Sequence, residues 1–541
     1  MKYIVVTGGV LSGLGKGITA SSIGLLLKRC GYRITAIKID PYLNCDAGTM
    51  NPFEHGEVFV LDDGGEVDLD LGNYERFLDI SVGSEHNITT GKVYKTVIDK
   101  ERRGDFLGKT VQIVPHIVDE IRTRIVEVAQ KAKADVTIVE LGGTVGDIES
   151  MPFIEALRQL SREAGRDNVA FVHTTLVPIM GVVGEQKTKP TQHSVKELLS
   201  LGIRPDIIVC RGSEPITKGT IQKISLFCDV PEDAVFSAHD QDNVYQVPQL
   251  FNEQGMSRVV QERLCLPKKK PDMRSWNIFV DNIMKATDTV DIVIVGKYSK
   301  LKDSYLSHIK SFDHAGAEAG AKVNMVWVEA PDKGSKTFNE DVKKMYKVLA
   351  KADGILIPGG FGTRGTEGKV LAASYARQKK IPFLGICLGL QMATVAYARD
   401  VLGYRDANST EFDKGTKHPV VCMLPEQTKI RYKGATMRLG AHECLIKKGT
   451  LAYGLYKSTK ISERHRHRYE INPEYIDVLE KHGLKFSGRS PDGIKMEIGE
   501  VPSHPFYIAV QYHPEFKSRP TRPAPLYFGL VDAALKYKKG K

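Results

Sequence analysis

The chain has 541 residues, 42% of them hydrophobic and 26% charged, a composition typical of soluble globular proteins. It is too long for one hydrophobic core, so we expect two or three domains. No apolar run is long enough to cross a bilayer and no signal-peptide pattern opens the chain, which predicts a cytoplasmic protein.

Charge and cysteine content exclude several classes of function. The 76 lysines and arginines exceed the 65 aspartates and glutamates by 11, but they are dispersed, apart from clusters at 268–270 and 536–541. This pattern argues against a nucleic acid polymer or a membrane as partner and favours small polyanions such as nucleoside triphosphates. The eight cysteines form no CxxC pair and no regular spacing, which argues against disulfides and structural zinc.

A glycine-rich loop follows the first apolar stretch. Residues 3–6 (YIVV) predict a buried strand and residues 18–29 predict a helix, with TGGVLSGLGKG between them. The loop therefore lies at a helix N-terminus, where unpaired backbone N–H groups and the helix dipole favour an anion. Lys16 adds a full positive charge. We interpret the loop as a phosphate site.

This loop departs from the GxxxxGK[ST] pattern. Gly9 is one residue too far from Gly15, and Gly17 stands where the pattern has a hydroxyl residue. An ordinary glycine turn with an exposed lysine is therefore the alternative interpretation.

Carboxylates follow later strands in a way that supports the phosphate site. Residues 33–40 (RITAIKID) predict a second strand, with Lys38 and Asp40 at its end, so a parallel sheet is expected to bind ligands at this edge. The acidic stretch after residue 61 is interpreted mostly as a surface loop, but Asp70 is singled out. Glu140 ends a predicted buried strand, where a carboxylate is costly without a cation. Magnesium takes one or two protein carboxylates together with phosphate oxygens and water, which Asp70 and Glu140 would suit.

A further basic segment lies downstream. Residues 171–178 predict another strand, and Lys187 and Lys189 precede a helix predicted over 194–201. The arrangement fits a second anion site and fits a plain basic loop about as well.

The second half of the chain contains a cysteine in a distinctive setting. Residues 352–362 (ADGILIPGGFG) predict a strand and a glycine turn whose N–H groups suit an oxyanion. Residues 381–391 (IPFLGICLGLQ) place Cys387 between glycines, after a strand and before a helix, like a nucleophile elbow. A helix N-terminus favours the thiolate. Residues 506–515 (FYIAVQYHPE) supply His513 as a base and Glu515 to orient it.

These stretches carry a family resemblance that spans the whole chain. Residues 1–270, including KERRGDFLG at 100–108, resemble the synthetase domain of the CTP synthase family. Residues 352–362, 381–391 and 506–515 resemble the class I glutamine amidotransferase domain. The resemblance implies a ligase of pyrimidine biosynthesis that aminates UTP to CTP, using ATP, Mg²⁺ and ammonia from glutamine.

The resemblance also implies roles for residues in the first half. The residues that bind ATP would be Gly13, Leu14, Gly15, Lys16, Gly17 and Ile18. The residues around UTP or the product CTP would be Ser12, Asp147, Ile148, Glu149, Lys187, Thr188, Lys189, Pro190, Thr191, Gln192 and Lys223. Asp70 and Glu140 would hold the Mg²⁺ ion.

In the second half the resemblance implies a triad of Cys387, His513 and Glu515. The oxyanion donors would be the backbone of Gly360 and Leu388. The residues that hold glutamine would be Gly360, Gln391, Glu411 and Arg468. The resemblance further implies activation by GTP, with contacts at Phe361 and Arg364, inhibition by CTP, and homotetramers that assemble into filaments.

The expected fold class is α/β, with two doubly wound parallel-sheet domains, one P-loop-like and one a class I glutaminase. We expect a synthetase domain over 1–270, a linker over 271–290 and an amidotransferase domain over 291–541. Because ammonia in water at neutral pH is largely protonated, we expect a dry internal passage between the sites. The resemblance places its gate near Pro52, His55 and Val58.

The expected chemistry at the first site is phosphorylation of O4 of UTP by ATP, with Lys16 and Lys38 neutralising charge, followed by displacement of phosphate by ammonia. Two alternative functions remain open. One is a related two-domain synthetase of the cobyrinic acid type, which amidates another acceptor. The second is a scaffold that binds nucleotides without turnover.

Overall fold

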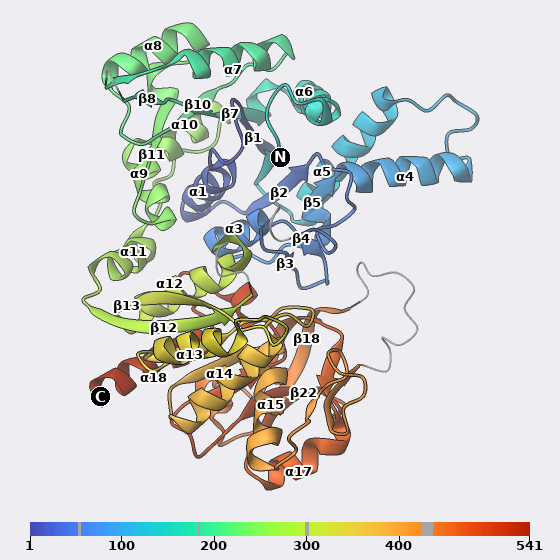
Figure 1. The fold of residues 1–541 in the computed structure, drawn as a ribbon. Helices are drawn as coiled ribbons and strands as arrows, with labels where there is room; N and C mark the ends of the chain where they lie inside the picture. Colours follow the sequence, from blue (N-terminus) through green and yellow to red (C-terminus); the bar gives the residue numbers. More distant parts are fainter. Residues whose placement is uncertain (52–55, 182–183, 298–301, 424–436) are drawn as a thin grey trace. The chain divides into compact units, whose positions relative to one another are not determined.

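The computed structural model describes residues 1–51, 56–181, 184–297, 302–423 and 437–541 (Figure 1). The chain forms two compact units. The first comprises Met1–Ala47 and Asp70–Asn277, and the second comprises Gly48–Leu69 and Ile278–Lys541. Residues 48–69, expected in the first domain, group with the second unit, and the later boundary between the units falls inside the segment expected as a linker. The segment expected as a linker contains helix α11 (Arg274–Lys285) and the start of a strand.

The first unit is built on a seven-stranded sheet in which every neighbouring pair is parallel. In spatial order the strands are β11 (Val235–His239), β10 (Ile207–Gly212), β7 (Val169–Leu176), β1 (Lys2–Gly8), β6 (Val136–Leu141), β2 (Ile34–Asp40) and β5 (Asn87–Thr89). Strand β1 lies in the middle and is buried along nearly its whole length. Its apolar run fits a strand that helices cover on both faces.

Helices connect these strands and cover the sheet. They include α1 (Lys16–Arg29), α3 (Leu69–Leu78), α5 (Val118–Lys131), α6 (Met151–Ala164), α7 (Lys189–Ser200) and α8 (Lys218–Cys228). Helix α7 begins five residues before the predicted helix at 194. The loops after β1, β2, β6 and β7 all leave the carboxyl edge of the sheet, which is where such sheets bind ligands.

The second unit is built on a mixed nine-stranded sheet. Its first five strands run parallel, and the last four add on antiparallel. In spatial order they are β13 (Ala321–Glu329), β12 (Asp288–Gly296), β14 (Gly354–Ile357), β15 (Phe383–Ile386), β23 (Tyr507–Val510), β22 (Met496–Glu500), β21 (Lys485–Arg489), β18 (Arg438–Ile446) and β19 (Lys460–His467). Two α/β units, one built on a wholly parallel sheet and one on a sheet with five parallel strands, confirm the expected fold class.

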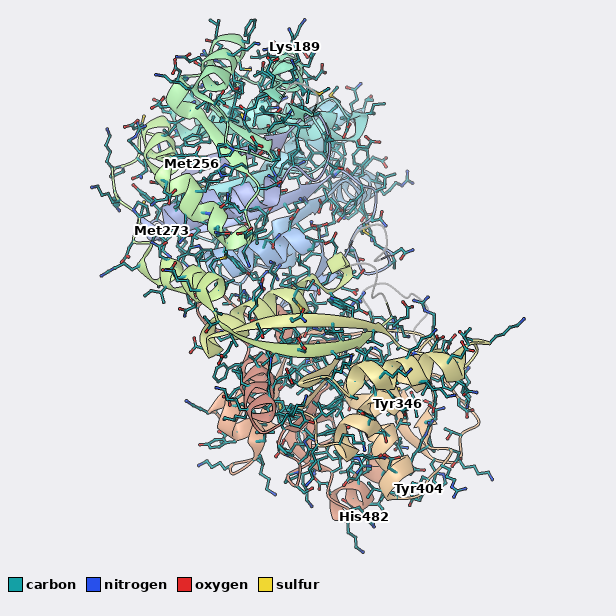
Figure 2. All side chains as sticks on the ribbon, turned by 60° about the vertical axis from the view of Figure 1, so that its left-hand side comes forward. Lys189, Met256, Met273, Tyr346, Tyr404 and His482 are labelled. Carbon is teal, nitrogen blue, oxygen red and sulfur yellow. The ribbon has the colours of Figure 1, made fainter. Side chains whose placement is uncertain are left out.

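Two hydrophobic clusters flank this sheet, one on each face. The helices on one face are α13 (Phe338–Leu349), α14 (Thr366–Gln378) and α15 (Leu388–Val401), and those on the other are α12 (Leu306–Ala319) and α18 (Pro525–Lys539) (Figure 1). Tyr346 of α13, labelled in Figure 2, stacks on Tyr375 of α14 with ring centroids 5.1 Å apart. Because helices pack on both faces of the sheet, the loops at the carboxyl ends of its parallel strands are held in fixed positions.

Residues 48–69 are fastened to the second unit by charged side chains. Arg464 pairs with Asp62 at 2.7 Å, and Arg466 pairs with Glu66 at 2.7 Å. The segment contains the short strands β3 (Phe59–Val60) and β4 (Glu66–Val67). Within the described ranges, no helix combines the length and the apolar character that crossing a membrane requires.

Candidate active sites

The phosphate loop of the first unit ends at Gly15, which adopts a left-handed conformation (φ 80°) as the N-cap of α1. Lys16 follows at the first helical position, is 8% exposed, and donates from Nζ to the carbonyl oxygen of Gly143 at 2.8 Å. A side chain at Gly8 would lie 2.7 Å from Cδ of Lys16, so glycine is needed for the lysine to fold back over the loop. The loop thus places a buried cation beside the free N–H groups of a helix.

A cluster of charges lies next to this loop. Lys38, at the end of β2, donates from Nζ to Glu140 Oε1 at 2.7 Å and also to Asp70. Tyr74 of α3 donates its hydroxyl to the second oxygen of Glu140. A side chain at Gly17 would lie 2.4 Å from Asp70 Oδ1, so the carboxylate reaches the start of α1. The structure therefore brings the predicted residues Lys16, Lys38, Asp70 and Glu140 together.

The pKa values within this cluster follow burial and partner charge. Burial lowers the pKa of Lys16, and Glu140 only partly offsets it. Burial opposes the charge of Lys38 as well, but Asp70 and Glu140 raise the pKa of Lys38 well above its ordinary value. Burial raises the pKa of Glu140, with Lys38 acting in the opposite direction. The two carboxylates thus share one lysine.

The donor set fits Mg²⁺ that is also bound by phosphate. Among the described residues, no group of three or more His, Cys, Asp or Glu side chains forms a closed metal cage. Two carboxylates at the carboxyl edge of the sheet match the one or two protein ligands that Mg²⁺ uses when phosphate oxygens and water complete its shell.

The other residues predicted to contact nucleotide lie on separate loops of the first unit. Ser12 is in the phosphate loop, and Asp147, Ile148 and Glu149 are exposed after β6. Thr188 is buried as the N-cap residue of α7, where it accepts from the side chain of Gln192 at 3.0 Å. The remaining residues of this set lie at the start of α7, in the turn before it and on α8; they are Lys187, Lys189, Pro190, Thr191 and Lys223.

The second unit holds Cys387 in a tight turn between β15 and α15. The residue has φ 52° and ψ −103°, a strained conformation for a non-glycine residue, and its N–H donates to Val510 O at 2.7 Å. A side chain at Gly389 would lie 2.3 Å from Ile357 O, and one at Gly385 would lie 2.9 Å from the backbone of Gly389. These glycines let strand, turn and helix pack closely, as the predicted nucleophile elbow requires.

Gly389→Ala should therefore distort the elbow. The new methyl group must displace the carbonyl of Ile357, and such overpacking costs about 1–3 kcal/mol. We expect a lower melting temperature and loss of Cys387 reactivity. Gly454→Ala, where a side chain would meet nothing within 4 Å, is the matched control and should melt no lower than the wild type, because it lies in helix α16 (Leu451–Tyr456). Unchanged Cys387 reactivity in Gly389→Ala would contradict the packing argument.

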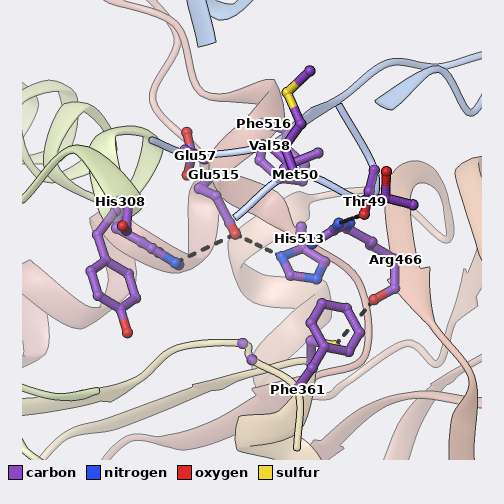
Figure 3. A pocket seen from close by; sticks show the side chains of 16 residues that line it. Thr49, Met50, Glu57, Val58, His308, Phe361, Arg466, His513, Glu515 and Phe516 are labelled. Carbon is purple, nitrogen blue, oxygen red and sulfur yellow. Dashed lines mark hydrogen bonds and ion pairs between the residues drawn. The ribbon is translucent and has the colours of Figure 1, made fainter. Parts of the chain in front are cut away.

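His513 and Glu515 lie beside the elbow. His513 Nδ1 and Glu515 Oε1 are 2.7 Å apart, and His513 Nε2 is buried without a hydrogen-bond partner among the described residues. Burial opposes the charge of His513, but Glu515 and then Cys387 raise its pKa to about 10. Figure 3 shows Glu515 between His513 and His308. The Nε2 atom of His308 lies 3.6 Å from Glu515 Oε1. The arrangement suits an imidazolium held by a carboxylate next to a thiolate.

Glu515→Gln should change the pH dependence of Cys387 alkylation by iodoacetamide. The folded pKa of His513, about 10, lies above its ordinary value of 6.5, so wild-type His513 keeps its proton until the pH rises through about 10. Loss of the carboxylate lowers the pKa of His513. Each pKa unit lost reduces the population of the ion pair between His513 and Cys387 by up to about tenfold. Alkylation should fall about tenfold or more at neutral pH and recover as the pH rises. Identical wild-type and variant profiles would contradict this assignment.

Two cavities meet at Cys387. One is lined by Gly360, Phe361, Cys387, Leu388, Gln391, Glu411, His467, Arg468 and Tyr469, which include all the residues predicted to contact glutamine. The other, of about 240 Å³, is lined by residues of the glycine turn, the triad and the segment 48–69; they include Gly48, Thr49, Met50, Glu57 and Val58. Cys387 thus separates a small pocket from a larger one. Of the predicted gate residues, Val58 lines the larger cavity, and Pro52 and His55 lie outside the described residues.

The two residues predicted to contact GTP lie at the glycine turn. Phe361 is 46% exposed, and the guanidinium of Arg466 lies 4.9 Å from its ring centroid. Arg364 donates to Lys297 O at 2.7 Å and lies 3.7 Å from Glu329.

Sequence reasoning missed several polar residues around both sites. Gln511 donates to Cys387 Sγ at 3.6 Å and stands two residues before His513, a proximity that could have revealed it. His308 and Lys369 lie on helices far away in the sequence, where neither has a local signal. His173, which lies between Thr7 and Ser194, has its pKa lowered to about 3 by burial and then by Lys16.

Two family profiles together match most of this chain. A family profile described as CTP synthase N-terminus matches residues 2–266, and one described as glutamine amidotransferase class-I matches residues 300–533. A CTP synthase of Pyrococcus furiosus is 59% identical over 100% of this chain and 99% of its own, and one of Archaeoglobus fulgidus is 55% identical with the same coverage. A solved glutaminase domain of Trypanosoma brucei CTPS with bound acivicin is 38% identical and covers 46% of this chain and 94% of its own, with a TM-score of 0.42.

The fold and the profiles together define an enzyme with a class I glutamine amidotransferase domain joined to a nucleotide-dependent synthetase domain. The chain belongs to the CTP synthase family, whose members are carbon–nitrogen ligases that take nitrogen from glutamine. The match favours this family over the cobyrinic acid type of synthetase.

Proposed function

We propose that the chain converts UTP to CTP, using ATP and the amide nitrogen of glutamine. The observation that carries this proposal is the elbow cysteine, with His513 and Glu515 beside it and all the expected glutamine contacts lining one pocket. The first-unit cluster of Lys16, Lys38, Asp70 and Glu140 supports it.

The glutaminase step begins with the Cys387 thiolate. Its sulfur attacks the amide carbon of glutamine, forming a C–S bond while the carbonyl oxygen takes the negative charge. The N–H of Leu388, at the first turn of α15, and that of Gly360 donate to this oxyanion. His513 then gives its proton to the nitrogen as the C–N bond breaks, releasing ammonia. Water hydrolyses the thioester to glutamate, with His513 accepting a proton from it.

The synthetase step occurs at the first unit. The phosphate loop and Lys16 bind ATP phosphates, Lys38 stabilises charge on the transferred phosphoryl group, and O4 of UTP accepts it. Ammonia then displaces phosphate at C4. Asp70 and Glu140 would hold Mg²⁺, which neutralises phosphate charge when bound. Residues Ser12, Asp147 to Glu149, Lys187 to Gln192, and Lys223 are proposed to bind UTP or CTP.

Ammonia is proposed to pass between the sites without entering bulk water. The larger cavity at Cys387 supports this, since it is lined by Val58 and other residues of the segment 48–69. That segment lies in the chain between Lys38 and Asp70. We also propose that GTP activates the enzyme through Phe361 and Arg364 and that CTP inhibits it. We propose further that the chain forms homotetramers, which assemble into filaments.

The test is an assay for CTP with purified protein. Formation should require UTP, ATP, Mg²⁺ and either glutamine or ammonium, and one phosphate should be released per CTP. Failure of UTP to yield CTP with both nitrogen sources, while glutamine is still hydrolysed, would point to another acceptor. No phosphate release and no hydrolysis would restore the scaffold interpretation.

A further inference from the structure

Lys369 is a buried cation that the glutaminase mechanism above does not use. It lies in the first turn of α14 and is 0% exposed. No carboxylate within the described ranges forms an ion pair with it. Burial, and then the charge of Lys297, lower its pKa to about 7. A lysine buried without a counter-charge costs free energy, so its local contacts are informative.

Those contacts are two carbonyl oxygens of the glycine turn after β14. Lys369 Nζ donates to Pro358 O at 2.8 Å, and it lies 3.5 Å from Gly359 O. A side chain at Gly360 would lie 3.7 Å from the same nitrogen. The ammonium group therefore lies against the backbone of Pro358, Gly359 and Gly360, on the side of the Pro358 and Gly359 carbonyl oxygens.

Peptide geometry relates these carbonyls to the oxyanion donors. In a planar trans peptide, the C=O of one residue and the N–H of the next point in opposite directions. Holding Pro358 O and Gly359 O on one side therefore turns the N–H groups of Gly359 and Gly360 to the other. Neither N–H has a backbone acceptor among the described residues. Cys387 and His513 lie next to this turn, because a side chain at Gly359 would be 2.9 Å from His513 Cε1 and 3.6 Å from Cys387 Cβ.

We propose that Lys369 is the positioning residue of the oxyanion hole: it holds the peptide planes of the glycine turn so that the N–H of Gly360 faces the oxygen of the carbonyl group that Cys387 attacks. Its charge also lies behind the developing oxyanion, where a preorganised cation acts without reorganisation. Lys297 holds the next part of the turn in the same way, because its Nζ donates to Phe361 O at 2.6 Å. The inference rests on the proposed glutaminase function of Cys387.

The test compares two reactions of the same sulfur in Lys369→Met. Hydrolysis of glutamine develops an oxyanion, whereas alkylation by iodoacetamide is a displacement at carbon that develops none. We expect the kcat for glutamine hydrolysis to fall about 100-fold, as for loss of one oxyanion donor. The KM for glutamine and the alkylation rate should change by less than about threefold. Because Cys45 and Cys265 are exposed, alkylation is measured on the Cys387 peptide by mass spectrometry.

Two further variants complete the design. Lys310→Met, which removes a largely buried lysine paired with Asp313 at 3.1 Å, is the matched control and should behave like the wild type in both reactions. Lys369→Arg keeps a charged donor and should recover part of the lost kcat. If Lys369→Met does not fold, the same comparison is made with the neutral variant Lys369→Gln.

The outcomes are distinct. Hydrolysis within about threefold of wild type in the neutral variant would overturn the inference, and so would a parallel loss of alkylation, which indicates a collapsed pocket. If the wild-type protein itself does not hydrolyse glutamine, the proposed function fails before the variant is considered.

Discussion

Cys387→Ala should abolish CTP formation from glutamine and leave formation from added ammonium unchanged. Alanine has no nucleophile for the amide carbon, so we expect a loss of at least about 1,000-fold with glutamine. Ammonium salts supply the nitrogen directly, and the cluster around Lys38 contains no atom of Cys387. The measurement is the absorbance change from UTP to CTP, with each nitrogen source at saturation.

The control for this variant is Cys422→Ala, which alters a partly buried cysteine outside both cavities that meet at Cys387. It should retain both activities. Persistence of glutamine-dependent synthesis in Cys387→Ala would remove the thiolate from the mechanism. Loss of both activities in a folded protein would contradict the separation of two sites.

Lys16→Met should produce the complementary result. Its side chain is the cation at the phosphate loop, and loss of such a charge from phosphoryl transfer typically costs about 1,000-fold or more. CTP formation should therefore disappear with glutamine and with ammonium alike, while Cys387 still reacts with iodoacetamide. Because burial lowers the pKa of Lys16, the protein holds this charge at some cost, and Lys16→Met should melt no lower than the wild type.

Lys92→Met serves as the control, since Lys92 donates to Asn87 O at 2.9 Å in the same unit but lies outside the cluster. It should keep both activities. Ammonium-dependent synthesis at a normal rate in Lys16→Met would contradict the assignment of the phosphate loop.

Local patterns predicted the parts of the molecule that depend on neighbours in sequence. The elbow at Cys387 was visible because its flanking glycines and the change from strand to helix lie within eleven residues. Lys38 and Glu140 were visible because each lies at the end of an apolar strand, whereas Asp70 was singled out of an acidic stretch and lies in the first turn of α3. Ends of elements were less accurate: α7 starts at Lys189, because Pro190 lies in its first turn, ahead of its apolar residues.

Features that depend on distant contacts could not be predicted. The acidic residues around Asp62 and Glu66 read as a surface loop, and only their pairing with Arg464 and Arg466, about 400 positions later, assigns the segment 48–69 to the second unit. The buried position of Lys369 could not be predicted for the same reason. A lysine in an ordinary helical sequence is normally exposed, and nothing near it indicates that the glycine turn lies over its ammonium group.

The most direct test of the whole account is transfer of labelled nitrogen. The enzyme is supplied with UTP, ATP, Mg²⁺ and glutamine carrying ¹⁵N in its amide group, in a buffer that also contains unlabelled ammonium below the level that supports synthesis alone. The account predicts CTP with ¹⁵N in its exocyclic amino group, at nearly the enrichment of the glutamine. CTP without the label, formed while glutamine is hydrolysed, would contradict it.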